Sequence, residues 1–218
     1  MKKNKISASI LGADLANIEQ EVIKVCKAGV DSIHLDIMDG VFVPNITFGP
    51  SLVSRIKEIS TVPIKTHLMI KDPKDFVDKF INAGSETIIF HYESEIHCDK
   101  LVEYIKTKNV KVGISLLPST NESVLKYLYD KLNEILIMTV NPGFGGQTFL
   151  ENQVKKIRNV KKSTAHMKNI DIGVDGGINP ITLKRCVKNG ANLGVVGSYI
   201  FNSYDYTQTV LELRKSFF

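Results

Sequence analysis

The order of its segments constrains this chain more than any other feature of its sequence. Short runs rich in Val, Ile and Leu alternate with longer amphipathic runs along its whole length. Runs of the first kind are typical of buried strands, and runs of the second kind are typical of helices that cover a sheet. We expect strands over Lys5–Leu11, Ser32–Met38, Pro63–Ile70, Thr87–Glu93, Lys111–Leu117, Glu134–Val140, Asp171–Asp175 and Leu193–Ser198.

Helices are predicted between these strands. Asp72 and Asn179 each precede a proline, a pairing typical of an N-cap followed by the first helical residue. Glycines that can end a helix are Gly29, Gly84 and Gly190. The expected helices are Asp14–Ala28, Pro50–Ile59, Pro73–Ala83, Ile96–Lys108, Glu122–Tyr129, Phe149–Ser163, Pro180–Asn189 and Tyr204–Lys215.

Eight strand–helix units in 218 residues favour one architecture. Strict alternation implies a parallel sheet covered by helices. Eight units favour a closed (β/α)8 barrel, the TIM barrel, forming a single domain over residues 1–218. The alternative is an open doubly wound sheet, but no GxGxxG motif follows the first strand to indicate a dinucleotide site.

Composition narrows the classes of function. The net charge of +5 comes from dispersed lysines without a dense basic block, so we expect no nucleic-acid partner. No apolar run reaches the ~18 residues that a membrane span needs, so we expect no membrane partner. Cys26, Cys98 and Cys186 are far apart and form no CxxC pair, which indicates reduced thiols in a cytoplasmic protein. We also expect a homo-oligomer.

Polar residues gather near the ends of the predicted strands, where the chemistry of a barrel lies. They are Ser7, Ser9, His34, Asp36, His67, His91, Glu93 and Asp175. Each has an ordinary alternative explanation, since a lone strand histidine is commonly a hydrogen-bonded core residue and a terminal Asp commonly caps a helix. His34 and Asp36 share strand parity and therefore point the same way.

Together, His34, Asp36, His67 and Asp175 make a reasonable site for a divalent first-row metal. Zinc, iron, manganese and cobalt all suit such a mixed nitrogen and oxygen set. Closing the barrel would bring Asp36 and Asp175 to one mouth from different sides. That arrangement suits a reaction that needs an acid and a base on opposite faces of one carbon.

Glycine-rich segments end the sixth, seventh and eighth predicted strands. Backbone N–H groups at Gly176, Gly177, Gly197 and Ser198 could hold a phosphate, since loops after strands seven and eight commonly do so in such barrels. The alternative at each site is a simple tight turn. The longer run NPGFGGQ, which includes Gly143, Phe144, Gly145 and Gly146, is a candidate lid over the substrate.

Three methionines share parity with the inward polar groups: Met38, Met69 and Met138. Core filling is one explanation for them. The other is a dry, polarizable wall over the reacting carbon, which would exclude water from a reactive intermediate.

The chain resembles the ribulose-phosphate 3-epimerase family along essentially its whole length. The resemblance rests on SASILGADLA at 7–16, HLDIMDGVFVPNITFGP at 34–50, HLMI at 67–70, MTVNPGFGGQTF at 138–149, VDGGIN at 174–179 and VVGSYIF at 195–201. It implies a (β/α)8 barrel of the ribulose-phosphate-binding type that interconverts ribulose 5-phosphate and xylulose 5-phosphate in the pentose phosphate pathway.

The resemblance also implies the site. One divalent metal would sit on His34, Asp36, His67 and Asp175, with Asp36 and Asp175 as the acid–base pair. Ser9 and His67 would contact the sugar, 143–146 would close over it, and Gly176, Gly177, Gly197 and Ser198 would hold the phosphate. Removing the C3 proton beside the ketone gives an enediolate, whose charge a Lewis acid stabilises.

Some positions depart from the family pattern: Ala8 stands where Pro is usual, Gly12 where Ser or Ala is common, Val41 where Gly, His or Arg is frequent, and Lys65 where Asp is common. Two other functions stay open at this point. One is an epimerase for a six-carbon ketose phosphate, and the other is a non-catalytic phosphosugar-binding barrel. A decarboxylase on this fold would want a DxKxxD arrangement, which the sequence lacks.

Overall fold

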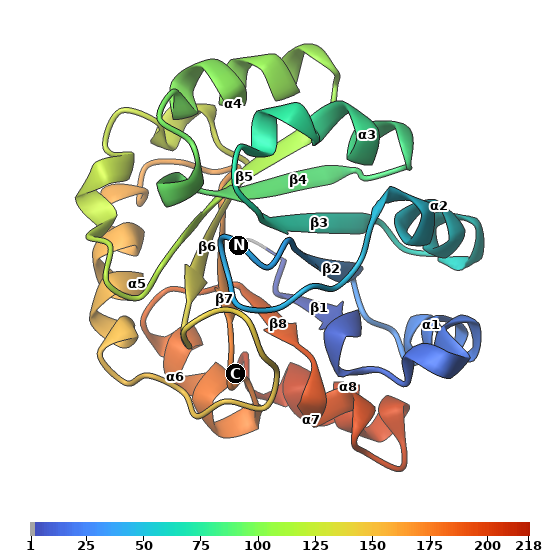
Figure 1. Cartoon of the computed structure of the whole chain (residues 1–218). Helices are drawn as coiled ribbons and strands as arrows, with labels where there is room; N and C mark the ends of the chain where they lie inside the picture. Colours follow the sequence, from blue (N-terminus) through green and yellow to red (C-terminus); the bar gives the residue numbers. More distant parts are fainter. Residues whose placement is uncertain (1–2) are drawn as a thin grey trace.

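Eight parallel strands close into a barrel in the computed structural model, which describes residues 3–218. Helices surround the barrel on all sides (Figure 1). The strands are β1 (Lys5–Ser9), β2 (Ser32–Met38), β3 (Ile64–Met69), β4 (Thr87–His91), β5 (Lys111–Leu116), β6 (Glu134–Met138), β7 (Asp171–Asp175) and β8 (Leu193–Val196). Hydrogen bonds between β1 and β8 close the ring, so the predicted TIM barrel is confirmed and the open sheet is wrong.

Most of the predicted helices are present. They are α1 (Ile18–Lys27), α2 (Pro50–Ile59), α3 (Val77–Asn82), α4 (Cys98–Thr107), α5 (Gln153–Ser163), α6 (Pro180–Lys188), α7 (Ser198–Phe201) and α8 (Tyr206–Lys215). The short helix α7 was not expected: Ser198 was assigned to the end of the last strand, and residues 199–201 were assigned to no element. Strands β1, β4, β6 and β8 also end earlier than predicted, since the chain turns away from the sheet at the barrel mouth.

The helix predicted over Glu122–Tyr129 is wrong. Two short 3₁₀ segments, Glu122–Leu125 and Tyr129–Lys131, replace it. Asn121 caps the first segment by accepting from the amide of Ser123. The backbone hydrogen bonds that follow join residues three apart, as from Lys126 to Ser123 and from Leu128 to Leu125, which is the 3₁₀ pattern.

The predicted helix-end signals have mixed outcomes. Asn179 caps α6 through its side chain and forms a capping box with Thr182. Asp72 caps nothing through its side chain and instead takes a left-handed conformation with φ of 50° before the 3₁₀ segment Pro73–Asp75. Gly29, Gly84 and Gly190 all have positive φ just past helix ends, as predicted.

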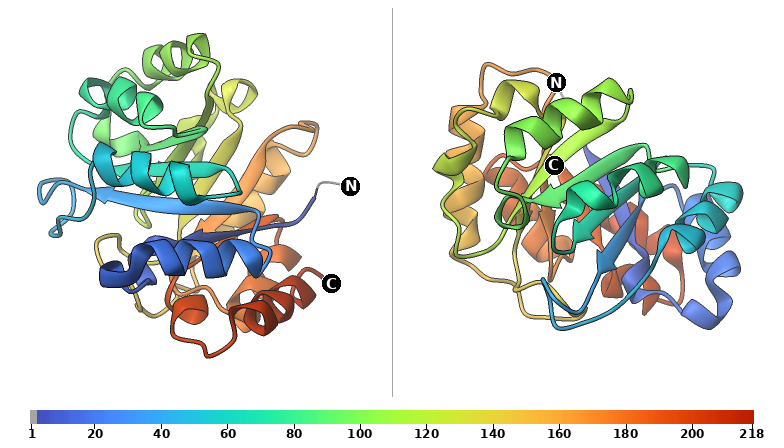
Figure 2. Two further views of the ribbon diagram at one scale, coloured as in Figure 1. Left: turned by 90° about the vertical axis from the view of Figure 1, so that its right-hand side faces the viewer. Right: turned by 45° about the horizontal axis from the view of Figure 1, so that its top comes forward.

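Two loops lie at the mouth of the barrel. Loop 39–49 follows β2, and loop 139–152 follows β6; both lie at one end of the barrel, opposite the N-terminal end of β1 (Figure 2). Inside the barrel, Ile89, Leu136 and Val195 form a fully buried apolar cluster. None of the helices in residues 3–218 has the length and apolar character that crossing a bilayer requires.

The prediction of a single domain over residues 1–218 stays a prediction. Its first two residues lie outside the part of the chain that the structure describes.

Candidate active site

Strand register brings the first site residues together. His34 and Asp36 both point into the barrel from β2, which is buried along its whole length. Asp36 lies beside His67 of β3 in the parallel pairing, and Ser9 of β1 lies beside His34. Adjacent inward positions on neighbouring strands place these side chains in contact.

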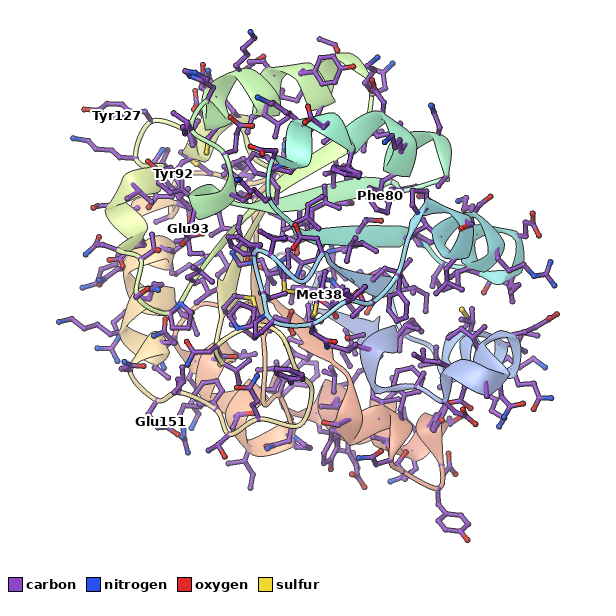
Figure 3. The ribbon with its side chains drawn as sticks, in the orientation of Figure 1. Met38, Phe80, Tyr92, Glu93, Tyr127 and Glu151 are labelled. Atoms are coloured by element: carbon purple, nitrogen blue, oxygen red, sulfur yellow. The ribbon has the colours of Figure 1, made fainter. Side chains whose placement is uncertain are left out.

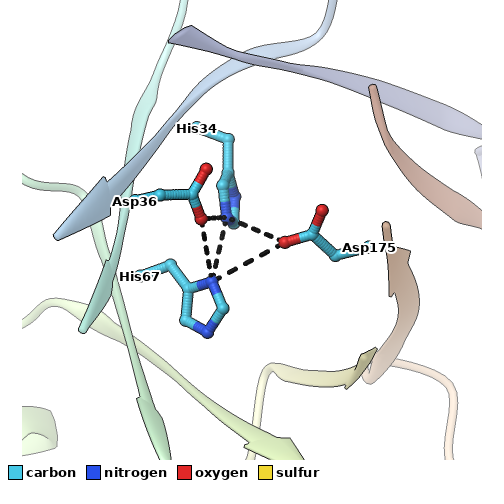
Figure 4. Close-up of side chains that lie close together, drawn as sticks. All are labelled: His34, Asp36, His67 and Asp175. Atoms are coloured by element: carbon cyan, nitrogen blue, oxygen red, sulfur yellow. Dashed lines mark hydrogen bonds and ion pairs between the residues drawn. The ribbon is translucent and has the colours of Figure 1, made fainter. Parts of the chain in front are cut away.

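Asp175 completes a four-residue cluster from the other side (Figure 4). Nε2 of His34 lies 3.2 Å from Oδ1 of Asp36 and 3.7 Å from Oδ2 of Asp175. Nδ1 of His67 lies 3.1 Å from the same Asp36 oxygen and 3.7 Å from the same Asp175 oxygen. One ligand atom from each residue lies within 4.8 Å of all the others.

The two carboxyl groups have opposite pKa shifts. Burial alone would raise the pKa of Asp36, but the charge and hydrogen bond of His34 and the hydrogen bond of His67 outweigh it and lower that pKa. Burial raises the pKa of Asp175 to about 7, and the negative charge of Asp36 acts in the same direction. Ser9 Oγ donates to Asp36 Oδ2 at 2.7 Å, which fixes the orientation of that carboxylate.

The two imidazoles are both buried, and their pKa values are also shifted in opposite directions. Burial lowers the pKa of His67 to about 3, with the hydrogen bond to Asp36 opposing the shift only in part. The pKa of His34 is raised, because Asp36 outweighs the burial that would otherwise lower it. A protein usually avoids gathering so many ionisable groups inside an apolar barrel unless something compensates them.

A divalent metal ion fits this donor set. Two imidazole nitrogens and two carboxylate oxygens converge on one volume, which matches the ligand preferences of first-row divalent metals. A 2+ ion would also compensate the buried carboxylates.

His91 and Glu93 lie beside this cluster and are not among its four members. Nε2 of His91 is 3.0 Å from Nε2 of His67, on the side of that ring that faces away from the cluster. Glu93 in turn lies 3.4 Å from Nδ1 of His91.

A pocket opens from the cluster to the barrel mouth. With the exception of His67, every residue predicted to contact the sugar phosphate lines it: Ser9, Gly143, Phe144, Gly145, Gly146, Gly176, Gly177, Gly197 and Ser198. Asp36 and Asp175 lie in the same lining. The structure therefore brings the predicted residues to one place, and their roles stay predictions.

Two glycines after β7 are required by close packing. A Cβ on Gly176 would lie 2.3 Å from a Val140 methyl, and one on Gly177 would lie 2.8 Å from the Phe149 backbone nitrogen. Both have positive φ. Gly12 likewise packs against the backbone of Ser198, where a Cβ would lie 2.8 Å from the amide nitrogen. The Gly12 departure therefore lets the backbone of Gly197 and Ser198 pack closely against it beside the predicted phosphate site.

The candidate lid is held by contacts that sequence reasoning missed. Asn45 Nδ2 donates to the carbonyl of Gly143 at 2.7 Å, joining the two mouth loops. Gln147 Nε2 donates to the carbonyls of Asn141 and Phe144, which braces the lid from inside. Asn45 and Gln147 both lie within motifs that carry the family resemblance, and only that membership could have marked them as functional from the sequence.

The three methionines line the same pocket: Met38, Met69 and Met138. Met38 and Met69 are paired in register on β2 and β3 and form a small apolar cluster with Val43. Figure 3 shows Met38 near the middle of the barrel mouth. They therefore lie where they can cover a bound substrate as well as fill the core.

Lys65 has a partner inside the barrel. Its ammonium pairs with Glu134 of β6, and both side chains are almost fully buried. The cation that the sequence placed unexpectedly near the site is thus compensated by a carboxylate 69 positions away.

Comparison with known proteins assigns the family. A family model described as the ribulose-phosphate 3 epimerase family matches residues 5–201. This chain belongs to that family. It is an enzyme, an epimerase of the isomerase class, as the resemblance implied.

Relatives at about 40% identity extend over nearly the whole chain. The ribulose-phosphate 3-epimerase of Bacillus subtilis strain 168 is 40% identical, covering 97% of this chain and 99% of the relative. The Escherichia coli K12 ribulose-phosphate 3-epimerase is 38% identical over 98% and 96%. The chloroplastic ribulose-5-phosphate-3-epimerase of Arabidopsis thaliana is 42% identical over 97% and 76%.

Solved structures with low identity show the fold alone. A 3-keto-L-gulonate-6-phosphate decarboxylase from Vibrio cholerae aligns with a TM-score of 0.73 at 13% identity, covering 99% of this chain and 98% of the other. A 3-hexulose-6-phosphate synthase from Salmonella typhimurium aligns with a TM-score of 0.72 at 15% identity, covering 98% of each. Both likenesses agree with the TIM barrel seen here.

Proposed function

We propose that this chain interconverts D-ribulose 5-phosphate and D-xylulose 5-phosphate by inverting C3, with one divalent metal ion at the cluster. The observation that carries the proposal is the convergence of His34, Asp36, His67 and Asp175 within 4.8 Å at the base of the mouth pocket. The relatives' name, ribulose-phosphate 3-epimerase, supports a ribulose phosphate as the substrate and C3 as the carbon that is inverted. We propose that this reaction serves the pentose phosphate pathway.

The ion would be held by two imidazoles and two carboxylates, and it would supply Lewis-acid stabilisation of the charge that develops on the sugar. Zinc, iron, manganese or cobalt would suit these ligands. The methionines Met38, Met69 and Met138 lie over the same volume and would keep water from the reactive intermediate.

Asp36 and Asp175 are proposed as the two bases. In one direction, the ionised Asp36 takes the C3 proton and the enediolate forms; protonated Asp175 then gives a proton to the opposite face. In the metal-free cluster the pKa of Asp36 is lowered and that of Asp175 is raised to about 7, so the surroundings of the two carboxyl groups already differ in this sense. In the reverse direction the two residues exchange roles.

The glycine segments are proposed to bind the phosphate and the lid to close over the sugar. Backbone amides around Gly176, Gly177, Gly197 and Ser198 line the pocket beside Asp175, so an anion there would place the sugar carbons at the cluster. Ser9 and His67 would contact the sugar. Gly143, Phe144, Gly145 and Gly146 belong to a loop already joined to the β2 loop through Asn45.

The assay that tests this function follows ribulose 5-phosphate by NMR while metal content is measured on the same sample. The unchanged protein should form xylulose 5-phosphate and carry metal, and a six-carbon ketose phosphate should react more slowly. His67→Ala should lose bound metal and most activity together. A metal-free His67→Ala protein that kept full activity would contradict the metal's role, and binding of the sugar without turnover would contradict the epimerase.

We further propose that the enzyme works in the cytoplasm as a homo-oligomer. Cys26, Cys98 and Cys186 are free thiols in the structure, which suits a reducing compartment. Light scattering of the purified protein would test the oligomer, and a monomer at working concentration would contradict it.

A further inference from the structure

His67 lies at the start of a chain of three polar side chains that leads away from the candidate metal cluster. His67 and His91 approach through their Nε2 atoms, 3.0 Å apart, with ring planes only 21° from parallel. On the far side of His91, Nδ1 lies 3.4 Å from Oε2 of Glu93. Both histidines are fully buried.

The proton positions along this chain follow from the geometry. Nδ1 of His67 is the atom that faces Asp36 and Asp175, so it is the atom that would ligate a metal and must offer its lone pair. A neutral imidazole then carries its proton on Nε2 and donates it to His91. Nε2 of His91 must accept, which leaves the His91 proton on Nδ1, facing Glu93.

The Glu93 carboxylate is placed to accept a hydrogen bond from that Nδ1–H group. Its Oε1 already accepts from the backbone amide of Leu117 at 2.8 Å and from the Thr120 hydroxyl. Those bonds anchor the carboxylate and leave Oε2 facing His91 Nδ1. Within residues 3–218, His91 Nδ1 has no hydrogen-bond partner at ordinary distance. Figure 3 shows Glu93 farther from the barrel centre than Met38, beyond the end of β4.

We propose that Glu93 and His91 are positioning residues that fix the tautomer of His67 and thereby set the affinity of the cluster for its metal. This inference rests on the proposed metal site. Glu93 acts only through His91, and His91 acts only through His67. Outer partners of metal-binding histidines commonly hold the ring orientation and raise ligand basicity.

Glu93→Gln tests the proposal with zinc as the probe metal. A glutamine that keeps its carbonyl on the Leu117 amide turns its NH2 group toward His91. His91 Nδ1 must then accept, its proton moves to Nε2, and Nε2 meets the Nε2–H of His67. We expect zinc affinity, measured by competition with a chelator, to fall ~10- to 100-fold.

Thr120→Val is the matched control. It removes one donor from Oε1 of Glu93 but keeps the Leu117 amide and the carboxylate facing His91. Zinc affinity in this variant should stay close to that of the unchanged protein. An equal loss of zinc affinity in both variants would show that only the structure of the loop matters, and would overturn the positioning role of Glu93 and His91.

Nitrogen-15 NMR of the zinc-loaded unchanged protein gives a readout that does not depend on any variant folding. His91 should carry its proton on Nδ1, and a scalar coupling should join the two Nε2 atoms through the hydrogen bond. If zinc binds while the His91 proton is on Nε2, the positioning role of Glu93 and His91 is wrong and the metal site stands. If the protein binds no zinc or other divalent metal, the metal site is wrong, and the positioning role with it.

Discussion

At the scale of single residues, the same side chain has opposite properties at two positions. Asp36 is paired with two imidazoles and a hydroxyl, whereas Asp175 contacts the imidazoles only at 3.7 Å. The pKa of Asp36 is therefore lowered, while burial holds the pKa of Asp175 at about 7. An acid and a base of one chemical type can be set apart in this way by their surroundings alone.

Asp175→Asn should stabilise the metal-free protein at alkaline pH. The folded-state pKa of about 7 lies above the ordinary 3.8, so this group favours folding fully below pH ~4 and loses that contribution as pH rises through 7. The Asn variant has no such loss. Its gain in melting temperature over the unchanged protein, measured with chelator present, should thus grow from pH 5 to pH 8. In a chain of this size 1 kcal/mol corresponds to ~2–4 °C, and we expect the growth to be at least that large. A gain independent of pH would contradict the raised pKa.

Ser198→Asp should weaken substrate binding. It adds a negative charge at the predicted phosphate site, so the KM for the phosphorylated sugar should rise strongly while the metal content stays unchanged. Steady-state kinetics give the KM. Ser203→Asp, on the nearby loop after α7 but outside the mouth pocket, is the matched control, and an equal rise in both variants would argue against a local phosphate site.

At the scale of elements, regular strands were more predictable than connections. The inward parity of His34 and Asp36 followed from alternation along one strand, and β2 and β7 have the predicted bounds. The connection between β5 and β6 was mispredicted, because the spacing of Leu125, Leu128 and Tyr129 also suits a helix. The backbone hydrogen bonds of this segment join residues three apart, as from Leu128 to Leu125, and the apolar spacing does not distinguish this pattern from that of an α-helix.

Asn179→Ala should weaken α6 through its cap. The Asn179 side-chain oxygen accepts from the amides of Ile181 and Thr182, and the Thr182 hydroxyl accepts from the Asn179 amide. Losing such a cap costs ~1 kcal/mol of unfolding free energy, measurable by urea denaturation. Asn179→Ser keeps a capping oxygen and should retain most of the stability. Equal losses in the two variants would contradict the capping role.

At the scale of the whole molecule, ring closure creates contacts that no local pattern contains. Asp175 could be suspected from its position at a strand end, but its approach to His34 requires β7 to meet β8, and β8 to meet β1. The Lys65–Glu134 pair was beyond sequence reasoning for the same reason. Each residue alone is an ordinary charged side chain, and only the barrel brings them together.

Lys65→Met should destabilise the barrel strongly, because it leaves the buried carboxylate of Glu134 uncompensated. Removing one partner of a buried pair costs ~3–5 kcal/mol, whereas replacing both by apolar residues is commonly neutral or stabilising. Denaturant unfolding of Lys65→Met, Glu134→Leu and the double variant measures this directly. The double variant should recover most of the loss, and additive losses would show that the pair does not couple.

Exchange at C3 in D2O, by metal-replete Asp36→Asn and Asp175→Asn proteins, tests the central claim most directly. The unchanged enzyme should place deuterium at C3 of the product in both directions, because the returned proton comes from a group that has equilibrated with solvent. Each variant should lose epimerisation by ~100- to 10,000-fold, the usual cost of a missing acid or base. Each should still exchange the C3 proton of one epimer, a different epimer in each variant, because the remaining carboxylate still faces it. Near-normal epimerisation by metal-replete Asp175→Asn would contradict the two-base account.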